Sequence, residues 1–337
     1  MAYAGDRPLS VASSYGDIGR ETRRLNVNLP ALSLVESSEP IRRVDSVTST
    51  AGLAVVYPDI GEPYRGIFAR IIDGIEKGAK AAVRSYPIAS DQDSAELNAL
   101  LKRSGTKVVI ALGRQGLRAT AGLDRDIQIV VGGVLSVPES ETRSLMGVSL
   151  TPDPLLLFSR LKNLLPAIRR VIVVYNPQQN DWLIRLARDA AKMYGLELVA
   201  YEVRDLASAA RMYENVFASS DGKRDAVWLP QDATSVDENT ILPLVLKESW
   251  DRSVPVFSSS FLHVKKGALF ALYPDNVELG RTLAISALAA ISGETRRRGI
   301  LPLREVQVAI NLRTASHIGL VLGYQQQRSF DFIFPEP

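Results

Sequence analysis

The segment VIVVYNPQQN, residues 171–180, decides how the chain folds. Its first four residues are apolar and β-branched, which is typical of a strand that is buried on both faces. Pro177 ends such a strand because proline has no backbone N–H to give to a neighbour. Apolar residues then recur at helical spacing over 181–194, so we expect a helix there, capped by Asn180 or Asp181 and ended by Gly195. The loop over 175–180 therefore lies where open α/β sheets bind ligands.

The same strand-loop-helix unit repeats along most of the chain. We expect strands at 53–57, 81–86, 107–112, 127–131, 147–150, 171–175, 196–203, 225–229, 254–257, 267–273 and 306–310. Helices should fall within 67–75, 97–101, 155–164, 181–194, 207–216, 240–250 and 276–292, with a short one from 314. Strands that alternate with helices, twice over, predict an α/β protein with two doubly wound parallel-sheet, Rossmann-like lobes joined by a hinge.

The length of 337 residues exceeds what a single core usually organises, which also favours two lobes. We expect residues 1–50 to form an N-terminal extension. Residues 51–147 plus 276–304 should form the first lobe, and residues 148–275 plus 305–330 the second. If the chain crosses between the lobes near Gly147 and again near Asp275, loops from both lobes face one cleft, as in a hinged ligand trap.

The composition excludes several classes of function. With 40 basic and 37 acidic residues, the charge of +3 needs no nucleic-acid partner. The absence of cysteine excludes disulfides and thiolate metal sites. No apolar run approaches the roughly 20 residues of a membrane-spanning helix, so we expect no membrane insertion. The first residues contain no signal peptide, but Ala2-Tyr3-Ala4 fits the end of a leader; an exported protein whose leader was replaced by Met and a cytoplasmic protein are both open.

Polar residues follow the strand at 171–175. Tyr175, Asn176, Gln179 and Asn180 offer a ring and amides beside a helix N-terminus, which could hold a ligand carboxylate. Alternatively, the two asparagines only make the turn and the cap. We treat all four as candidate ligand-binding residues.

Further candidates follow the next strands of the second lobe. Gln231 and Asp232 come after the strand at 225–229, where the carboxylate could receive an ammonium group or could instead cap the next turn. Ser258 and Ser259 could donate hydroxyl hydrogen bonds, although serine is also a common loop residue. Asp275 is a candidate too, and with an acidic residue three positions on it resembles a capping box.

Two loops of the first lobe supply the facing candidates, after its first and third strands. They are Tyr57, Asp59, Tyr64, Gly113, Arg114 and Gln115. An arginine over a cleft could clamp an acidic group or stack on a ring, whereas most exposed arginines do neither.

The chain carries no recognisable catalytic motif. Its two histidines, His263 and His317, have no partner at metal-ligand spacing, and each fits a structural or exposed position. There is no nucleophile elbow, phosphate-binding loop or dinucleotide fingerprint. We therefore expect a protein that is not an enzyme, with no catalytic residue, no metal and no cofactor.

Seven short stretches, in order over roughly residues 50–325, resemble the tryptophan/tyrosine-type substrate-binding proteins of ABC transporters, which have a type I periplasmic-binding-protein fold. They are MGVS (146–149), VVYNP (173–177), AVWLPQD (226–232), VPVF (254–257), GA (267–268), Asp275 with LG (279–280), and AINL (309–312). Three first-lobe loops depart from the family pattern, at 59–63, 113–116 and 133–138.

The resemblance implies a monomeric, extracytoplasmic or periplasmic protein that closes two lobes on a small molecule and presents it to an ABC permease. That ligand would be an amino acid or an aromatic or polar derivative. The diverged first-lobe loops leave an alternative, a ligand-sensing or protein-interaction module that kept the fold and acts on a signalling partner. A third interpretation, an enzyme on a doubly wound fold, predicts turnover of a bound ligand.

Overall fold

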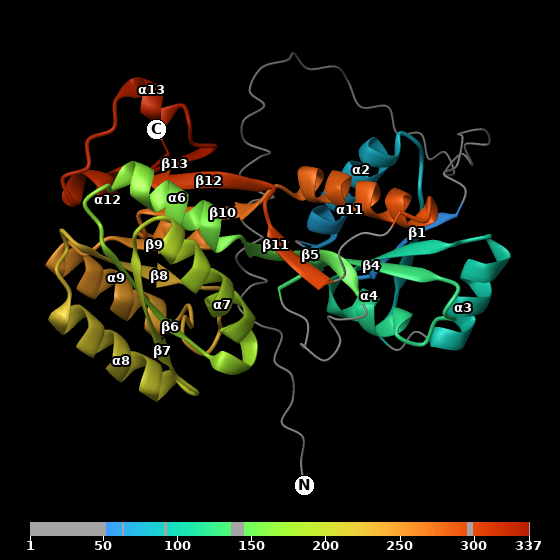
Figure 1. The fold of residues 1–337 in the computed structure, drawn as a ribbon, viewed down its shortest axis with the longest axis horizontal. Helices are drawn as coiled ribbons and strands as arrows, with labels where there is room; N and C mark the ends of the chain where they lie inside the picture. Colours follow the sequence, from blue (N-terminus) through green and yellow to red (C-terminus); the bar gives the residue numbers. More distant parts are fainter. Residues whose placement is uncertain (1–51, 63, 91–92, 136–144, 295–298, 337) are drawn as a thin grey trace, which may run out of the picture.

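The computed structural model describes residues 52–62, 64–90, 93–135, 145–294 and 299–336, which form two α/β lobes (Figure 1). The expected N-terminal extension, residues 1–50, lies outside the described residues. Each lobe is built on one sheet with helices packed against it, so the predicted α/β class with two parallel-dominated sheets is confirmed. Among the described helices, none combines the length and the apolar character that a bilayer crossing requires.

Sheet A, in the first lobe, has the strand order β11-β5-β4-β3-β1-β2. The strands are β1 (Leu53–Pro58), β2 (Arg84–Ile88), β3 (Val108–Leu112), β4 (Gln128–Val134), β5 (Met146–Pro152) and β11 (Gly299–Leu303). Every neighbouring pair is parallel. Helices α2 (Tyr64–Ala79) and α11 (Asn276–Ile291) cover one face, and α3 (Ser94–Arg103) and α4 (Gly113–Thr120) cover the other. A strand such as β3 is a continuous apolar run because both of its faces are covered.

Sheet B, in the second lobe, has the order β13-β12-β10-β9-β8-β6-β7. The strands are β6 (Arg170–Tyr175), β7 (Glu197–Glu202), β8 (Asp225–Leu229), β9 (Val256–Ser258), β10 (Phe270–Pro274), β12 (Val306–Asn311) and β13 (Phe332–Phe334). The helices are α6 (Pro154–Leu164), α7 (Pro177–Met193), α8 (Leu206–Ser219), α9 (Ile241–Arg252), α10 (Phe261–Lys266), α12 (Leu312–His317) and α13 (Tyr324–Gln327). One prediction is wrong in part: β12 runs antiparallel to β10, because the chain returns to this sheet from the other lobe.

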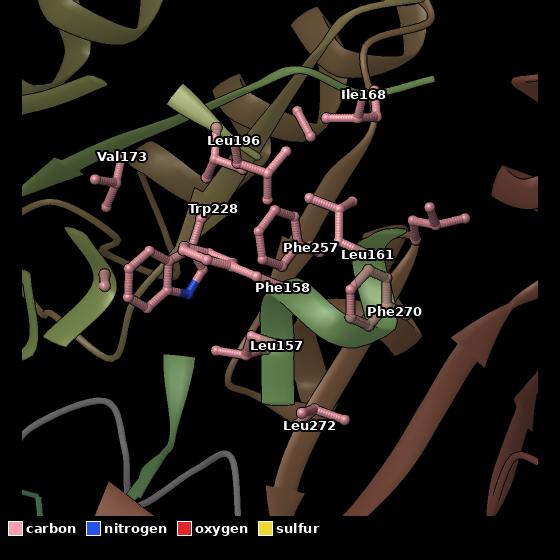
Figure 2. Packing of buried hydrophobic residues seen from close by; sticks show 14 of the residues in the cluster. Leu157, Phe158, Leu161, Ile168, Val173, Leu196, Trp228, Phe257, Phe270 and Leu272 are labelled. Carbon is pink, nitrogen blue, oxygen red and sulfur yellow. The ribbon is translucent and has the colours of Figure 1, made fainter. Parts of the chain in front are cut away.

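An aromatic cluster fixes α6 onto sheet B (Figure 2). The ring of Phe158 meets Trp228 edge-on at 5.8 Å and Phe257 at 6.3 Å, and Phe257 stacks on Phe270 at 5.2 Å. All four side chains are fully buried, and each such burial contributes about 1.5–3 kcal/mol. The middle of sheet B is therefore a rigid support for the loops at its strand ends.

The chain passes between the two sheets at three places, after β5, after β10 and after β11. The first crossing was expected near Gly147, but β5 stays paired in sheet A as far as Pro152. The crossings are fastened to one another. The Asp153 N–H donates to the Leu303 carbonyl at 2.8 Å, the Asp275 N–H donates to the Glu305 carbonyl at 2.9 Å, and Arg304 Nε lies 3.1 Å from Asp153 Oδ2.

Helices α2 and α11 approach each other so closely that only glycine fits at the contact. A Cβ atom at Gly74 would collide with the carbonyl oxygen of Val277, and one at Gly280 would collide with that of Ile71. Because α11 follows the second crossing, this contact attaches a returning segment to the first lobe.

Several predicted boundaries are wrong, mainly where a helix follows a strand without a loop. Helix α4 occupies the predicted loop at 113–116, because Gly113 with φ of 70° turns the chain directly from β3 into the helix. Helix α7 begins at Pro177 instead of 181, because the fixed φ of proline suits the first helical position. Helices α4, α10 and α13 and the edge strands β11 and β13 were not predicted.

Candidate functional site

Three loops lie side by side at the carboxyl end of sheet B. Strands β9, β8 and β6 are neighbours and run parallel, so the residues that follow them meet at one edge. These residues are 176–180, 230–235 and 258–260, and they include most of the candidates from the second lobe. We refer to them as the sheet B edge.

Asp232 is the centre of this edge. Its carboxylate is buried, with 3% of the residue exposed, and it accepts four hydrogen bonds. Oδ2 accepts from the Asn176 N–H at 2.6 Å and from Asn180 Nδ2 at 3.0 Å, while Oδ1 accepts from the N–H groups of Thr234 at 2.9 Å and Ser235 at 3.1 Å. Donors of the protein therefore surround this carboxylate, and its capping of the next turn is the role that the geometry displays.

Asn176 caps helix α7, whereas the sequence predicted a cap at Asn180 or Asp181. Its Oδ1 accepts from the Gln178 N–H at 3.0 Å, and its Nδ2 donates to Thr234 Oγ1 at 3.1 Å. The prediction placed the cap one turn too late because it read Pro177 as part of the loop. The side-chain amides of Asn176 and Asn180 thus connect the loop after β6 to the loop after β8 by hydrogen bonds.

Tyr175 and Gln179 have different surroundings. The ring of Tyr175 is buried in the large core of the second lobe, and its hydroxyl donates to Glu202 Oε1 at 3.2 Å. Burial and the nearby Glu202 carboxylate raise the pKa of Tyr175. Gln179 is half-buried on the first turn of α7, so it is more exposed to solvent than Tyr175.

Ser258 is held from three sides within the protein. Its hydroxyl lies 2.7 Å from His263 Nδ1 and 3.3 Å from the Leu229 carbonyl, and it accepts from the Ser260 N–H at 3.1 Å. Burial lowers the pKa of His263 to about 4, so the imidazole is neutral near pH 7. Of the two positions expected for His263, structural or exposed, the structural one is confirmed, since the side chain is buried and hydrogen-bonded beside the sheet B edge. Its spacing of five residues from Ser258, across a strand end, was the only signal in the sequence.

Three serine hydroxyls at the sheet B edge are buried without a hydrogen-bond partner. They belong to Ser235, Ser259 and Ser260, of which the sequence analysis proposed only Ser259. Gln231 fixes the loop beside them by donating from Nε2 to the Ser259 carbonyl at 3.1 Å. A buried hydroxyl without a partner is unfavourable, so these three groups are available to a water or a ligand.

The first-lobe candidates lie at the carboxyl ends of β1 and β3, which are neighbours in sheet A. Tyr57 is half-buried, with its ring 6.4 Å from that of Phe68. Tyr64 is also half-buried, and burial raises its pKa. Asp59 is exposed, with 63% of its side chain accessible, and Arg65 lies 3.9 Å from it.

The second loop of this edge begins helix α4. Gly113 is its first residue, and Gln115 donates from Nε2 to the Ile88 carbonyl at 3.0 Å, which ties the helix to β2. Arg114 is exposed, and no described carboxylate forms an ion pair with it. No side chain caps the N-terminus of α4, since Leu112 occupies the capping position. Residues 136–138 of the third divergent loop lie outside the described residues.

Asp275 follows β10, the parallel neighbour of β9, so it lies at the same carboxyl end of sheet B, where the second crossing begins. Its Oδ1 accepts from the N–H groups of Val277 and Glu278, each at 3.1 Å, so it caps α11 as the capping pattern predicted. Within the described ranges, no cluster of three or more His, Asp or Glu side chains is arranged to hold a metal ion.

Comparison with known proteins identifies the family of this chain. The family model described as ABC transporter substrate binding protein matches residues 70–323. No curated protein sequence matches the chain.

Solved structures share the fold at low sequence identity. The ligand-free, open structure of a substrate-binding protein with adhesive properties from Clostridium difficile has a TM-score of 0.56 and 16% identity, covering 83% of this chain and 98% of that one. The ABC domain in complex with L-Trp from Streptococcus pneumoniae has a TM-score of 0.53 and 16% identity, covering 85% and 100%. A conserved domain protein from Vibrio cholerae has a TM-score of 0.51 and 16% identity, covering 84% and 99%.

These likenesses confirm the predicted type I periplasmic-binding-protein fold, and at this identity they show the fold alone. The family match is independent of them and spans about three quarters of the sequence, including the sheet B edge and α4. The chain belongs to the substrate-binding protein family of ABC transporters.

Proposed function

We propose that this protein is the solute-binding component of an ABC importer and closes its two lobes on a small molecule. The observation that carries the proposal is the group of three buried hydroxyls without partners, on an edge otherwise organised by internal hydrogen bonds. A specific small-molecule site requires a rigid edge with a few polar groups that can still form hydrogen bonds to a ligand.

The proposed ligand is an amino acid or an aromatic or polar derivative of one. The family match supports a small solute, and the bound L-Trp of the Streptococcus pneumoniae structure supports this size and class. The proposed protein partner is an ABC permease, reached by a monomer outside the cytoplasm. No nucleic acid, cofactor or catalytic group is part of this proposal.

A thermal-unfolding screen with amino acids, their deaminated and decarboxylated derivatives, and nucleosides tests the proposal. A compound that binds only the folded protein stabilises it by about 2.7 kcal/mol at 100 times its Kd, which raises the melting temperature by a few degrees. Arg118→Gln, in the last turn of α4, is a control variant that should give the same shifts as the wild type. If no compound changes the melting temperature, the proposed function is wrong.

A further inference from the structure

The first two crossings between the lobes (Figure 1) leave the chain little freedom to rotate. In the first, Asp153 alone separates β5, which ends at Pro152, from α6, which begins at Pro154. In the second, Asp275 alone separates β10, which ends at Pro274, from α11. Each aspartate caps the helix that follows it, and proline has a fixed φ, so both crossings are stiff.

The third crossing is built differently. Arg304 and Glu305 connect Leu303, the buried last residue of β11, to Val306, the first residue of β12. Neither of the two connecting residues is a proline or a helix cap. Hinge motions are absorbed by a few residues of this kind, which change φ and ψ. We therefore expect rotation between the lobes to occur mainly at residues 304 and 305.

The side chain of Glu305 attaches this crossing to the first lobe. Its Oε1 accepts from the Thr282 hydroxyl of α11 at 2.8 Å. Helix α11 is held against α2 by the close contact at Gly74 and Gly280, so Thr282 moves with the first lobe. The preceding residue, Leu303, is buried in the core of the same lobe.

The side chain of Arg304 attaches the crossing to the second lobe. Its Nε lies 3.1 Å from Asp153 Oδ2, while Asp153 Oδ1 accepts from the Leu155 N–H in the first turn of α6 at 2.9 Å. Helix α6 is fixed on sheet B through Phe158. Consecutive residues of one crossing are thus bonded to opposite lobes, and the Arg304–Asp153 pair is a contact between them.

The exposure of this pair makes it reversible. The Arg304 side chain is 69% accessible, whereas that of Asp153 is 10% accessible. An ion pair with one well-solvated member is weak and is screened by salt. When it breaks, the guanidinium enters water and Asp153 keeps its bond to the α6 N-terminus, so neither lobe has to unfold.

We propose that Arg304 and Asp153 form a salt-sensitive restraint on the angle between the lobes. While the pair is formed, the lobes keep the arrangement of this structure; when it breaks, they rotate about residues 304 and 305. The proposal goes beyond the proposed function, because it concerns the free protein and holds whichever ligand is bound.

Electron–electron double resonance between two spin labels, recorded without ligand, measures the arrangement of the lobes. The chain contains no cysteine, so labels attach only to introduced ones. Arg103→Cys at the end of α3 and Met193→Cys at the end of α7 place one exposed label on each lobe. The distance distribution between the labels reports the fraction of molecules in each arrangement.

Two variants of the pair should change this distribution equally. Arg304→Gln removes the cation, and Asp153→Asn removes the carboxylate charge but keeps a good helix cap. Each should lower the ratio of molecules in the present arrangement to all others by about two- to fivefold, the range for an exposed ion pair, with the melting temperature unchanged. The double variant should match either single one, because both remove the same interaction.

A matched control and a salt series complete the experiment. Arg281 and Glu278 lie 3.0 Å apart within α11, so Arg281→Gln removes an ion pair inside one lobe and should leave the distribution unchanged. Raising the salt concentration from about 0.05 M to about 1 M should move the wild type toward Arg304→Gln and leave that variant as it is.

The outcomes separate the restraint from a general effect of charge. A wild-type distribution in Arg304→Gln overturns the proposal. Additive effects of Arg304→Gln and Asp153→Asn, an equal change in Arg281→Gln, or an equal response of Arg304→Gln to salt also overturn it. None of these results bears on the proposed function, which the thermal screen with ligands tests separately.

Discussion

At the carboxyl end of sheet B the charged side chain Asp232 is buried and hydrogen-bonded within the protein, whereas at the carboxyl end of sheet A the charged side chains Asp59 and Arg114 are exposed. Asp232 has 3% of its surface accessible and four internal donors. Asp59, which follows β1, has 63% of its side chain accessible and a single cation at 3.9 Å. The same kind of residue is therefore bonded within the fold in one lobe and exposed to solvent in the other.

This contrast agrees with where the sequence departs from its family. In the resemblance described above, the matching stretches include the strand ends of the second lobe, such as 226–232, and the loops at 59–63 and 113–116 are the expected departures. A residue that is hydrogen-bonded to its neighbours cannot be substituted alone without a loss of stability, whereas an exposed residue can. The exposed first-lobe loops can therefore be substituted with less loss of stability than the loops of the sheet B edge.

The largest expected effect comes from Asp232→Ala. Four donors would lose their acceptor, and we expect the free energy of unfolding to fall by about 3–5 kcal/mol, the range for an uncompensated buried partner. Urea denaturation measures it. The matched substitution Asp59→Ala should change stability by less than about 0.5 kcal/mol. Equal losses in the two variants would refute the contrast between the edges.

A fall in pH should lower the stability of the folded protein through His263, which lies beside the sheet B edge. Burial lowers its pKa from 6.5 to about 4, so between these values the unfolded chain binds a proton that the folded protein does not. Stability is therefore fully present above pH 6.5 and is lost as the pH falls to 4, by up to about 3 kcal/mol from this group. Urea denaturation of wild type and His263→Gln at several pH values isolates the effect. Parallel stability curves for the two proteins would contradict it.

Gly280→Ala should show that the first lobe depends on its helix pair for stability. The new methyl group would collide with the Ile71 carbonyl, and forced repacking costs about 1–3 kcal/mol. Gly61→Ala is the control on the exposed loop, where nothing lies within 4 Å of the added atom, and it should be neutral to about 0.5 kcal/mol. Differential scanning calorimetry compares the two. A neutral Gly280→Ala would mean that α2 and α11 separate easily.

The smallest effect distinguishes two adjacent serines that are equally buried. Ser258→Ala removes a hydroxyl that three groups contact and should cost about 1–2 kcal/mol. Ser259→Ala removes a hydroxyl without a partner and should be close to neutral in the free protein. Chemical denaturation of both variants tests this pair. A larger loss from Ser259→Ala would show that its hydroxyl is already satisfied by water.

Much of the fold could be predicted because its signals are local. Apolar runs such as 108–112 and 171–174 predict buried parallel strands. Their alternation with amphipathic helices predicts the α/β class and the two lobes. Helix α4 and the start of α7 were missed because each helix begins at once after its strand, where the sequence analysis expected a loop. The antiparallel β12 was missed because its direction depends on a crossing from the other lobe.

The candidate site was less accessible to sequence reasoning. Asp232 stands out as a carboxylate after a strand, but its four donors come from two loops separated by more than 50 positions along the chain, and only the fold brings them together. Ser235, Ser260 and His263 look like ordinary loop residues until burial is known. Arg114 could be proposed from the sequence because it directly follows the strongly predicted strand at 107–112.

The three crossings also limit how this molecule can be divided. Residues 276–303 contribute helix α11, which packs on α2, and the edge strand β11 of sheet A. The segment after them contributes β12 and β13 to sheet B. Cutting the chain at any one position leaves at least one lobe without a strand or a helix that it needs. A chimera that exchanges lobes with a relative therefore requires three junctions, placed near 152, 275 and 304, and the modular unit is the set of segments between them.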